Sequence, residues 1–267
     1  MHARVTWSTQ SIVILRCPVC ASIWGRHAVS EKGRPWEESY VPDHFARALR
    51  ARRETQALSL VRMLLRQTGE ASVLDYGCGQ GVFLRAAIDA GMDAIGCDLD
   101  LNVPHSVAPR HRVVALNAPW TVPDGSWDCV VMLDVLEHHA RPWEFLRALH
   151  SKYVLIKVPS ATGPAARIAR LCASLGRPQL LEQLFLVGEN FPHHWLATRA
   201  GIASLALESG FSVVSVCAIT EVGYELGRRM RTRASGWRRP VAALVGASLG
   251  MLGPVWSDAT VALLRRN

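Results

Sequence analysis

The chain has 267 residues, of which 49% are hydrophobic and 19% are charged, a balance that excludes a disordered chain and is sufficient for a sizeable core. The formal net charge is +8, which a solvated arginine-rich surface or an anionic partner such as a nucleotide-sugar, a phospholipid surface or RNA would explain. The basic clusters at 47–53 and 228–239 lack the interleaved aromatic residues of a single-strand binding groove. We therefore do not expect a nucleic-acid partner.

The seven cysteines are an odd number in a large chain, which excludes a secreted disulfide scaffold. Four of them lie in or beside apolar runs, and we expect them to be small buried hydrophobic residues: Cys78, Cys97, Cys129 and Cys217. The apolar stretch Ser11–Leu15 is too short for the core of a signal peptide. These features predict a cytoplasmic protein.

Residues 1–68 are expected to form an amino-terminal segment, helical from Asp43 onward, that packs over the following domain. The segment contains one C-x-x-C pair, Cys17 and Cys20, whereas a zinc ribbon needs two such pairs. The nearest other ligand types are His2 and His27. We therefore expect no bound metal here.

Residues 69–267 are expected to form the main domain, in which apolar strands alternate with helical patterns. The predicted strands of its first part are Ala71–Asp75, Asp93–Asp98, Arg112–Leu116, Trp127–Leu133 and Tyr153–Val158. Helices are predicted at Val82–Ala90 and, broken near Pro142, up to about His150. Strands that are apolar throughout and alternate with helices indicate a parallel sheet covered on both faces, which is the doubly wound α/β architecture.

Two insertions, at about 160–197 and 224–256, follow the fifth and sixth strands. The first contains predicted helices at Gly163–Leu175 and Gln179–Val187. Thr198 can cap a helix that ends at Gly210, before strands at Phe211–Ile219 and Asp258–Leu264.

The second insertion has an arginine-rich lead, from residue 228, followed by an apolar stretch at 240–256 that is short for a membrane span. It can lie in a membrane surface, giving peripheral contact with the inner membrane face. It can equally cover a substrate pocket or form a dimer contact. The sequence leaves these alternatives open, together with the oligomeric state.

The segment Val73–Gly81 carries the main chemical signal, because a strand and an acid lead into a G-x-G-x-G turn and a helix. Glycines allow positive φ and the close approach of a ligand, and a helix amino terminus offers free N–H groups to an anionic group. A dinucleotide fingerprint would need glycine where Val82 stands. Asp98, at the end of the next strand, can accept hydrogen bonds from a ribose diol. The combination favours an adenosyl ligand without a pyrophosphate.

Three segments resemble class I S-adenosylmethionine-dependent methyltransferases: Val73–Leu84, Ser126–His138 and Phe191–Phe211. The second is similar to the F-D-x-V…V-L-E-H pattern after strand four in enzymes that methylate sugars, lipids and quinones. The resemblance covers roughly residues 37–220 and the last strand. It implies a seven-stranded Rossmann-like sheet and S-adenosylmethionine as the cofactor.

The resemblance also implies roles for residues at matching positions. The glycines would lie against the methionyl part of the cofactor: Gly77, Gly79 and Gly81. Asp75 would orient the amino group of the methionyl part, and Asp98 would hold the ribose of the cofactor. Asn117, followed by Ala118, stands where the family often has an acid that binds the adenine amino group. Leu133 and Asp134 would lie beside the sulfonium.

Methyl transfer requires the acceptor to be aligned behind the methyl group and water to be excluded. A hydroxyl acceptor also benefits from a general base. We predict His194, and after it His138, as candidates for this base. The alternatives are a surface histidine for His194 and a structural residue at a helix start for His138.

The predicted function is methyl transfer from S-adenosylmethionine to a small or carrier-bound metabolite, with sugar-, polysaccharide- or lipid-linked acceptors as the first expectation. One alternative is an RNA or protein methyltransferase. Another is a non-catalytic adenosyl-binding or membrane-associated protein that keeps the fold. A nicotinamide enzyme is a further rival, which the ligand preference would exclude.

Overall fold

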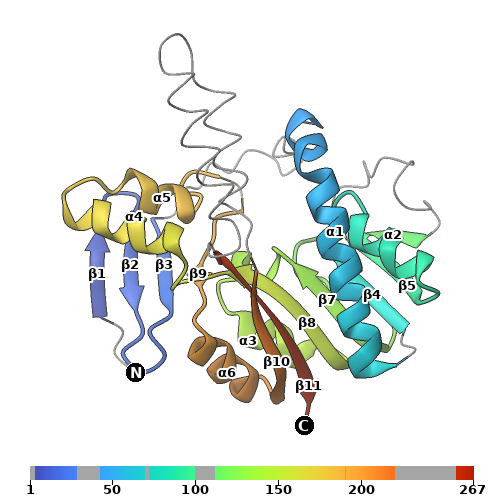
Figure 1. Cartoon of the computed structure of the whole chain (residues 1–267). Helices are drawn as coiled ribbons and strands as arrows, with labels where there is room; N and C mark the ends of the chain where they lie inside the picture. Colours follow the sequence, from blue (N-terminus) through green and yellow to red (C-terminus); the bar gives the residue numbers. More distant parts are fainter. Residues whose placement is uncertain (1–3, 29–42, 70–71, 100–111, 190, 220–256) are drawn as a thin grey trace. The chain divides into compact units, whose positions relative to one another are not determined.

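The computed structural model describes residues 4–28, 43–69, 72–99, 112–189, 191–219 and 257–267 (Figure 1). The predicted insertion at 224–256, with its apolar stretch, therefore lies outside the described residues. The chain divides into two compact units, each built from segments that are separated in sequence. A four-stranded sheet belongs to one unit, and most of a seven-stranded sheet belongs to the other.

The seven-stranded sheet follows the predicted alternation of strands and helices. Its strands are β4 (Ser72–Tyr76), β5 (Asp93–Asp98), β6 (Val113–Ala115), β7 (Trp127–Leu133), β8 (Ser151–Pro159), β10 (Phe211–Ile219) and β11 (Ala259–Arg266). The order across the sheet is β10-β11-β8-β7-β4-β5-β6, and the five strands from β8 to β6 are parallel. The predicted Rossmann-like α/β sheet is therefore confirmed.

The last strand, β11, runs against its neighbours. The N–H of Asn267 donates to the carbonyl of Gly210 at 3.1 Å, and the N–H of Asp258 donates to Ile219 at 3.1 Å. The first bond joins the end of β11 to the start of β10, and the second joins the start of β11 to the end of β10. The two strands are therefore antiparallel. The parallel arrangement predicted for the first five strands is therefore confirmed, and β11 makes the whole sheet mixed. The sequence predicted no direction for the last strand, because a buried strand is apolar in either direction.

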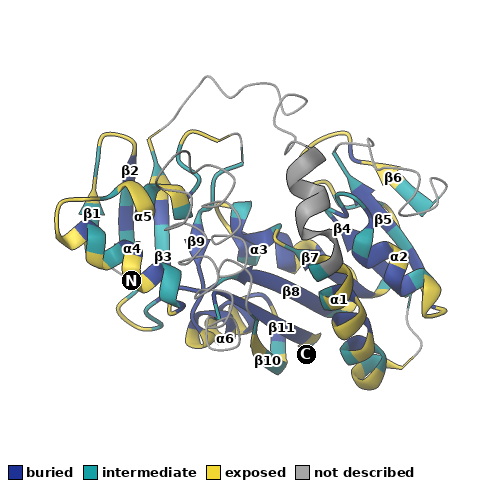
Figure 2. Cartoon of the chain, turned by 45° about the horizontal axis from the view of Figure 1, so that its top comes forward, coloured by how far each residue is buried: buried dark blue, intermediate teal, exposed yellow. Residues whose placement is uncertain are grey.

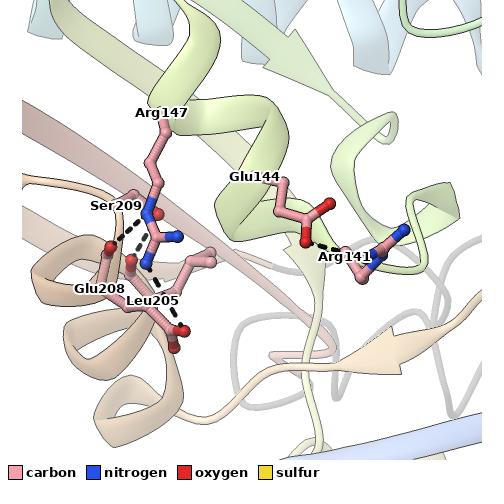
Figure 3. Close-up of polar contacts among 6 residues, drawn as sticks. All are labelled: Arg141, Glu144, Arg147, Leu205, Glu208 and Ser209. Carbon is pink, nitrogen blue, oxygen red and sulfur yellow. Dashed lines mark hydrogen bonds and ion pairs between the residues drawn. The ribbon is translucent and has the colours of Figure 1, made fainter.

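Five helices accompany this sheet: α1 (Asp43–Thr68), α2 (Val82–Asp89), η3 (Leu136–His138), α3 (Pro142–Ala148) and α6 (Arg199–Glu208). The helix predicted to be broken near Pro142 is a short 3-10 turn followed by α3. Pro142 begins α3 because its ring suits a first helical position, where no N–H is needed. Arg147 of α3 donates from Nε to the carbonyl of Glu208, the last residue of α6 (Figure 3).

The second sheet has the order β1-β2-β3-β9, with strands β1 (Arg4–Ser8), β2 (Ile12–Arg16), β3 (Ile23–His27) and β9 (Trp195–Leu196). All of its strand pairs are antiparallel. Helices α4 (Pro164–Ser174) and α5 (Gln179–Leu184) pack on this sheet (Figure 1). Both were predicted as helices from the sequence. Our sequence analysis predicted no strand before residue 71, because β1, β2 and β3 are short. It also missed β9, which has two residues and pairs with the distant β3.

Thr198 caps α6, as predicted. Its Oγ1 accepts the N–H of Gly201 at 2.9 Å, and its own N–H donates to Oγ of Ser22 at 3.2 Å. Its hydroxyl also donates to the carbonyl of Cys20 at 2.5 Å. The cap therefore ties the first turn of α6 to the turn between β2 and β3.

Three of the four cysteines that we expected to be buried are buried: Cys78, Cys97 and Cys129. The prediction is wrong for Cys217, which is exposed on β10. β10 is an edge strand of the sheet, so an apolar sequence there does not imply cover on both faces. None of the described helices is long and apolar enough to cross a membrane.

Candidate cofactor-binding site

The glycine-rich turn after β4 is fastened to the end of β5. The N–H groups of Gly77 and Cys78 both donate to the carbonyl of Cys97, at 2.8 and 3.0 Å. Gly77, Gly79 and Gly81 all have positive φ, at 71°, 51° and 72°, a conformation that favours glycine. The turn thus leads directly from β4 into α2, as the sequence predicted.

Two of these glycines differ in their surroundings. A Cβ added to Gly77 would lie 2.5 Å from Cγ2 of Val135, so this position has no room for a side chain. A Cβ added to Gly79 would meet no atom within 4 Å. One side of the turn is therefore packed against the protein, while the other leaves the backbone open to a ligand.

Asp98 lies against this turn. Its Oδ2 accepts the N–H of Gly79 at 2.7 Å, and the bond is partly buried. The carboxylate at the end of β5 and the open backbone after β4 are therefore neighbours, as an adenosyl-binding site requires. No bulky side chain stands between them, because the bond joins them directly.

Asp75 is a buried acid on β4, immediately before the turn. Burial, reinforced by the nearby charge of Asp98, raises its pKa to about 7, although the backbone N–H of Leu84 opposes this shift. Its Oδ2 has no hydrogen-bond partner in the described part of the chain. An unsatisfied buried carboxyl oxygen beside an open glycine turn fits a ligand with an ammonium group, such as the methionyl part of S-adenosylmethionine.

The ends of β6 and β7 share the edge of the sheet with these residues. The N–H of Leu116 donates to the carbonyl of Asp98 at 2.8 Å, so Asn117 and Ala118 follow directly and are exposed. Leu133 ends β7 and is partly buried. The carboxyl ends of parallel strands meet at one edge, and this is where such sheets bind ligands. The predicted cofactor residues therefore come from one edge.

Our sequence analysis missed the ion pair between Asp134 and Lys157 at this edge. Lys157 Nζ lies 2.5 Å from Oδ2 of Asp134, and the lysine side chain is 6% exposed, against 41% for the aspartate. Asp134 has a φ of 60°, rare for a residue other than glycine, and its N–H donates to the carbonyl of Lys157. The available signal was a lysine inside an apolar strand.

A cluster of aromatic rings also escaped the sequence analysis. Trp120 lies edge-on to His139, with ring centroids 4.5 Å apart, and 5.6 Å from Phe145. The Phe145 ring is in turn 5.1 Å from Tyr76, the residue before the glycine turn. Burial lowers the pKa of His139, an effect that Glu144 opposes and Arg141 strengthens. The cluster is therefore aromatic, and burial favours the neutral form of His139.

The two candidate bases lie in different elements. His138 ends η3, where its N–H donates to the carbonyl of Val135 at 3.0 Å. His194 precedes β9 of the four-stranded sheet: its carbonyl accepts the N–H of Gly25, and its ring lies edge-on to His27 with centroids 5.4 Å apart. These contacts fix the backbone of His138 and place the ring of His194 against His27.

The C-x-x-C pair lies in the turn between β2 and β3. The carbonyl of Cys17 accepts the N–H of Ala21 at 3.0 Å, and both thiols are free and partly buried. Among the described residues, neither cysteine belongs to a group of three side chains able to hold a metal ion. His2 lies outside the described residues. The expectation of no metal here stays a prediction.

A mostly parallel sheet with a glycine turn after one strand and a carboxylate after the next defines a protein of the Rossmann-like class that binds a nucleoside-containing ligand. A family model described as a methyltransferase domain matches residues 46–216, more than half of the sequence. The chain belongs to this methyltransferase domain family. The class predicted from the sequence is thus confirmed, and with it S-adenosylmethionine as the cofactor of the class.

Individual relatives agree with this assignment. An uncharacterized methyltransferase of Mycolicibacterium gilvum (strain PYR-GCK) is 34% identical over 117 residues, which are 40% of this chain and 44% of that protein. The chain therefore matches less than half the length of this curated relative. The magnesium protoporphyrin IX methyltransferase of Synechocystis PCC 6803, solved with bound S-adenosylhomocysteine (SAH), has a TM-score of 0.52 and 15% identity, covering 86% of this chain and 90% of that one.

A mycolic acid cyclopropane synthase, solved with SAH and CTAB, has a TM-score of 0.50 and 17% identity. The match covers 78% of this chain and 84% of that one. At these identities both solved structures show a shared fold.

Proposed function

We propose that the chain transfers a methyl group from S-adenosylmethionine to a small or carrier-bound acceptor. The observation that carries the proposal is the hydrogen bond from the N–H of Gly79 to the carboxylate of Asp98, at 2.7 Å. It joins the two features that a nucleoside-bearing cofactor needs: open backbone and an acceptor for its ribose. The neighbouring Asp75 adds a buried oxygen with no partner among the described residues.

In this proposal each residue of the edge has a separate task. The turn formed by Gly77, Gly79 and Gly81 lies against the methionyl part of the cofactor, and Asp75 orients its ammonium. Asp98 holds the ribose hydroxyls. Asn117 and Ala118 border the adenine, and Leu133 borders the sulfur: these three come from the ends of β6 and β7.

When bound, S-adenosylmethionine supplies a methyl group on a positively charged sulfur, which is already a good leaving group. The protein must then orient the acceptor and keep water out. We propose that Asp134, held by buried Lys157, accepts a hydrogen bond from the acceptor. If the acceptor is a hydroxyl, His194 or His138 removes its proton.

The proposed acceptor is sugar-, polysaccharide- or lipid-linked. The names of the two solved relatives refer to a protoporphyrin and to mycolic acid, which supports a small-molecule or lipid-type acceptor over RNA or protein. A test with candidate acceptors would follow SAH formation. Cofactor binding without turnover on any acceptor would favour the non-catalytic alternative.

Calorimetry tests the cofactor directly, because SAH should bind and NAD should not. Replacing Asp98→Ala should weaken SAH binding by about 1–3 kcal/mol, since the ribose loses hydrogen bonds to a carboxylate. The matched control is Asp93→Ala at the start of the same strand, where the carboxylate forms an exposed ion pair with Arg112. The control should bind SAH as the unmodified chain does. Preferential binding of NAD, or equal SAH affinity in both variants, would overturn the proposal.

A further inference from the structure

Helix α4 has an unusual distribution of large and small residues. Its alanines face the four-stranded sheet: Ala166, Ala169 and Ala173 are buried in one cluster with Ile12 and Ile14 of β2. Its large aliphatic residues lie on the solvent side instead. A helix that needed only to cover the sheet would place leucine inside and polar residues outside.

Four large aliphatic residues of α4 and the adjoining α5 are exposed. They are Ile168 (44% exposed), Leu171 (61%), Leu175 (72%) and, at the start of α5, Leu180 (42%). The spacing of three and four residues between the first three places them on one side of α4. Exposed residues run along this helix in Figure 2. We call these four residues the aliphatic stripe.

Arginines surround the aliphatic stripe. Arg167 and Arg170 lie on α4, and Arg177 lies between α4 and α5, whereas the segment 164–184 has one acidic residue, Glu182. Burial lowers the pKa of Arg170, and the nearby charges of Arg16 and Arg167 lower it further. In the described part of the chain, Arg16 and these three arginines form no ion pair with an acidic side chain, and we treat the four as one cluster. Their mutual repulsion therefore favours an anionic partner.

We propose that the aliphatic stripe and its arginines dock the protein on an anionic lipid surface. The four aliphatic side chains would enter the boundary between headgroups and acyl chains, and the arginines would contact lipid phosphates. This inference does not depend on methyl transfer. It also differs from the membrane contact expected at 228–256, which lies outside the described residues.

A second copy of the chain fits this surface less well. A symmetric dimer would set each arginine cluster against its own copy, since a two-fold interface pairs the same patch from both chains. The four arginines would then face four more, with Glu182 as the acidic residue of the segment in each copy. An anionic lipid surface instead supplies a negative charge for each of them.

Vesicle sedimentation with the full chain tests the proposal. The protein should bind vesicles of phosphatidylcholine with about 30% phosphatidylglycerol, and binding should weaken when NaCl rises from about 0.1 M to about 0.5 M. The double variant Leu171→Ser/Leu175→Ser should bind at least about tenfold more weakly, because two aliphatic side chains no longer enter the bilayer. The double variant Arg167→Gln/Arg170→Gln should lose most of its preference for anionic over neutral vesicles.

The matched control is Leu207→Ser, because Leu207 is 77% exposed on α6 outside the aliphatic stripe. It should bind vesicles as the unmodified chain does, and all variants should keep the circular dichroism spectrum and melting temperature. Absence of vesicle binding by the unmodified chain, or equal binding by the leucine double variant, would overturn the proposal. A dimer that the leucine variant dissociates, with no vesicle binding, would assign the surface to a second copy.

Discussion

Asp75 is a buried acid whose environment opposes its own charge. Its pKa of about 7 means that the folded chain holds a proton there that the unfolded chain, with an ordinary value of 3.8, has already lost. Folding stability from this group is therefore lost as the pH rises from about 4 to 7. The same buried carboxyl group can accept a hydrogen bond from a cationic ligand. Asp75 therefore favours ligand binding but lowers the stability of the ligand-free fold at neutral pH.

The variant Asp75→Asn separates these two effects. Without a bound ligand it should be more stable than the unmodified chain at about pH 8, by about 1–3 kcal/mol, and equally stable at about pH 3.5, below the unfolded pKa of the carboxyl group, because the amide never ionises. Denaturant unfolding at both pH values checks this. An identical difference at the two pH values would show that ionisation of Asp75 is not responsible.

Ligand affinity should show the complementary dependence on pH. Because the ionised form of Asp75 attracts the ammonium group in the proposed site, SAH binding to the unmodified chain should strengthen about tenfold between about pH 6 and pH 8. Calorimetry measures this change. Asp75→Asn should bind weakly and with no comparable trend, and a retained trend would place the titrating group elsewhere.

Gly77 tests the packed side of the turn. Gly77→Ala adds a methyl group close to Val135 at a φ of 71°, so it should cost about 2–4 kcal/mol of unfolding free energy. Gly69→Ala is the control, because Gly69 has a similar φ of 73° but no neighbour within 4 Å, and should cost about 1 kcal/mol. Equal losses in a denaturant titration would show that the contact with Val135 is unimportant.

At the scale of elements, α3 stabilises the end of α6. Arg147 donates to the last carbonyl of α6 at 2.8 Å, a group that the helix itself leaves unsatisfied, and its Nη2 lies 3.7 Å from the carboxylate of Glu208 (Figure 3). Arg141, the residue before α3, forms an exposed ion pair with Glu144 of the first turn of α3 instead. We therefore expect Arg147 to contribute more than Arg141 to the unfolding free energy.

Arg147→Ala should lower the unfolding free energy by about 0.5–1 kcal/mol, since it removes a charged donor from a helix carbonyl at a half-exposed site. Arg141→Ala should change it by less than about 0.5 kcal/mol, as expected for an exposed pair. Thermal unfolding of the two variants measures the difference. A larger loss for Arg141→Ala would contradict the assigned role of Arg147.

Elements with strong local signals were predicted well. β5 and β7 have the bounds that the sequence predicted, and α4 and α5 lie within the predicted helices. β9 has two residues, which no periodicity can reveal, and it exists because β3 offers an edge to pair with. Pairing with a distant segment therefore explains why β9 was missed, whereas β1, β2 and β3 were missed because each is short.

At the scale of the whole molecule, the position of charge matters more than its total. The net charge of +8 favoured a solvated surface and left an anionic partner as the alternative. Arg16 joins Arg167 and Arg170 only because β2 and α4 pack together in one unit. A composition cannot contain this information, since residues 16 and 170 are neighbours in space alone.

The sequence by itself determined the sheet of alternating strands and helices, the glycine turn and the acid at the end of the next strand. These depend on local φ, periodicity and strand order, which neighbouring residues encode. Only the tertiary structure decided the reversal of β11, the pairing of Lys157 with Asp134 and the outward stripe on α4. Each of these depends on which distant backbone or side chain is adjacent, and packing alone settles that.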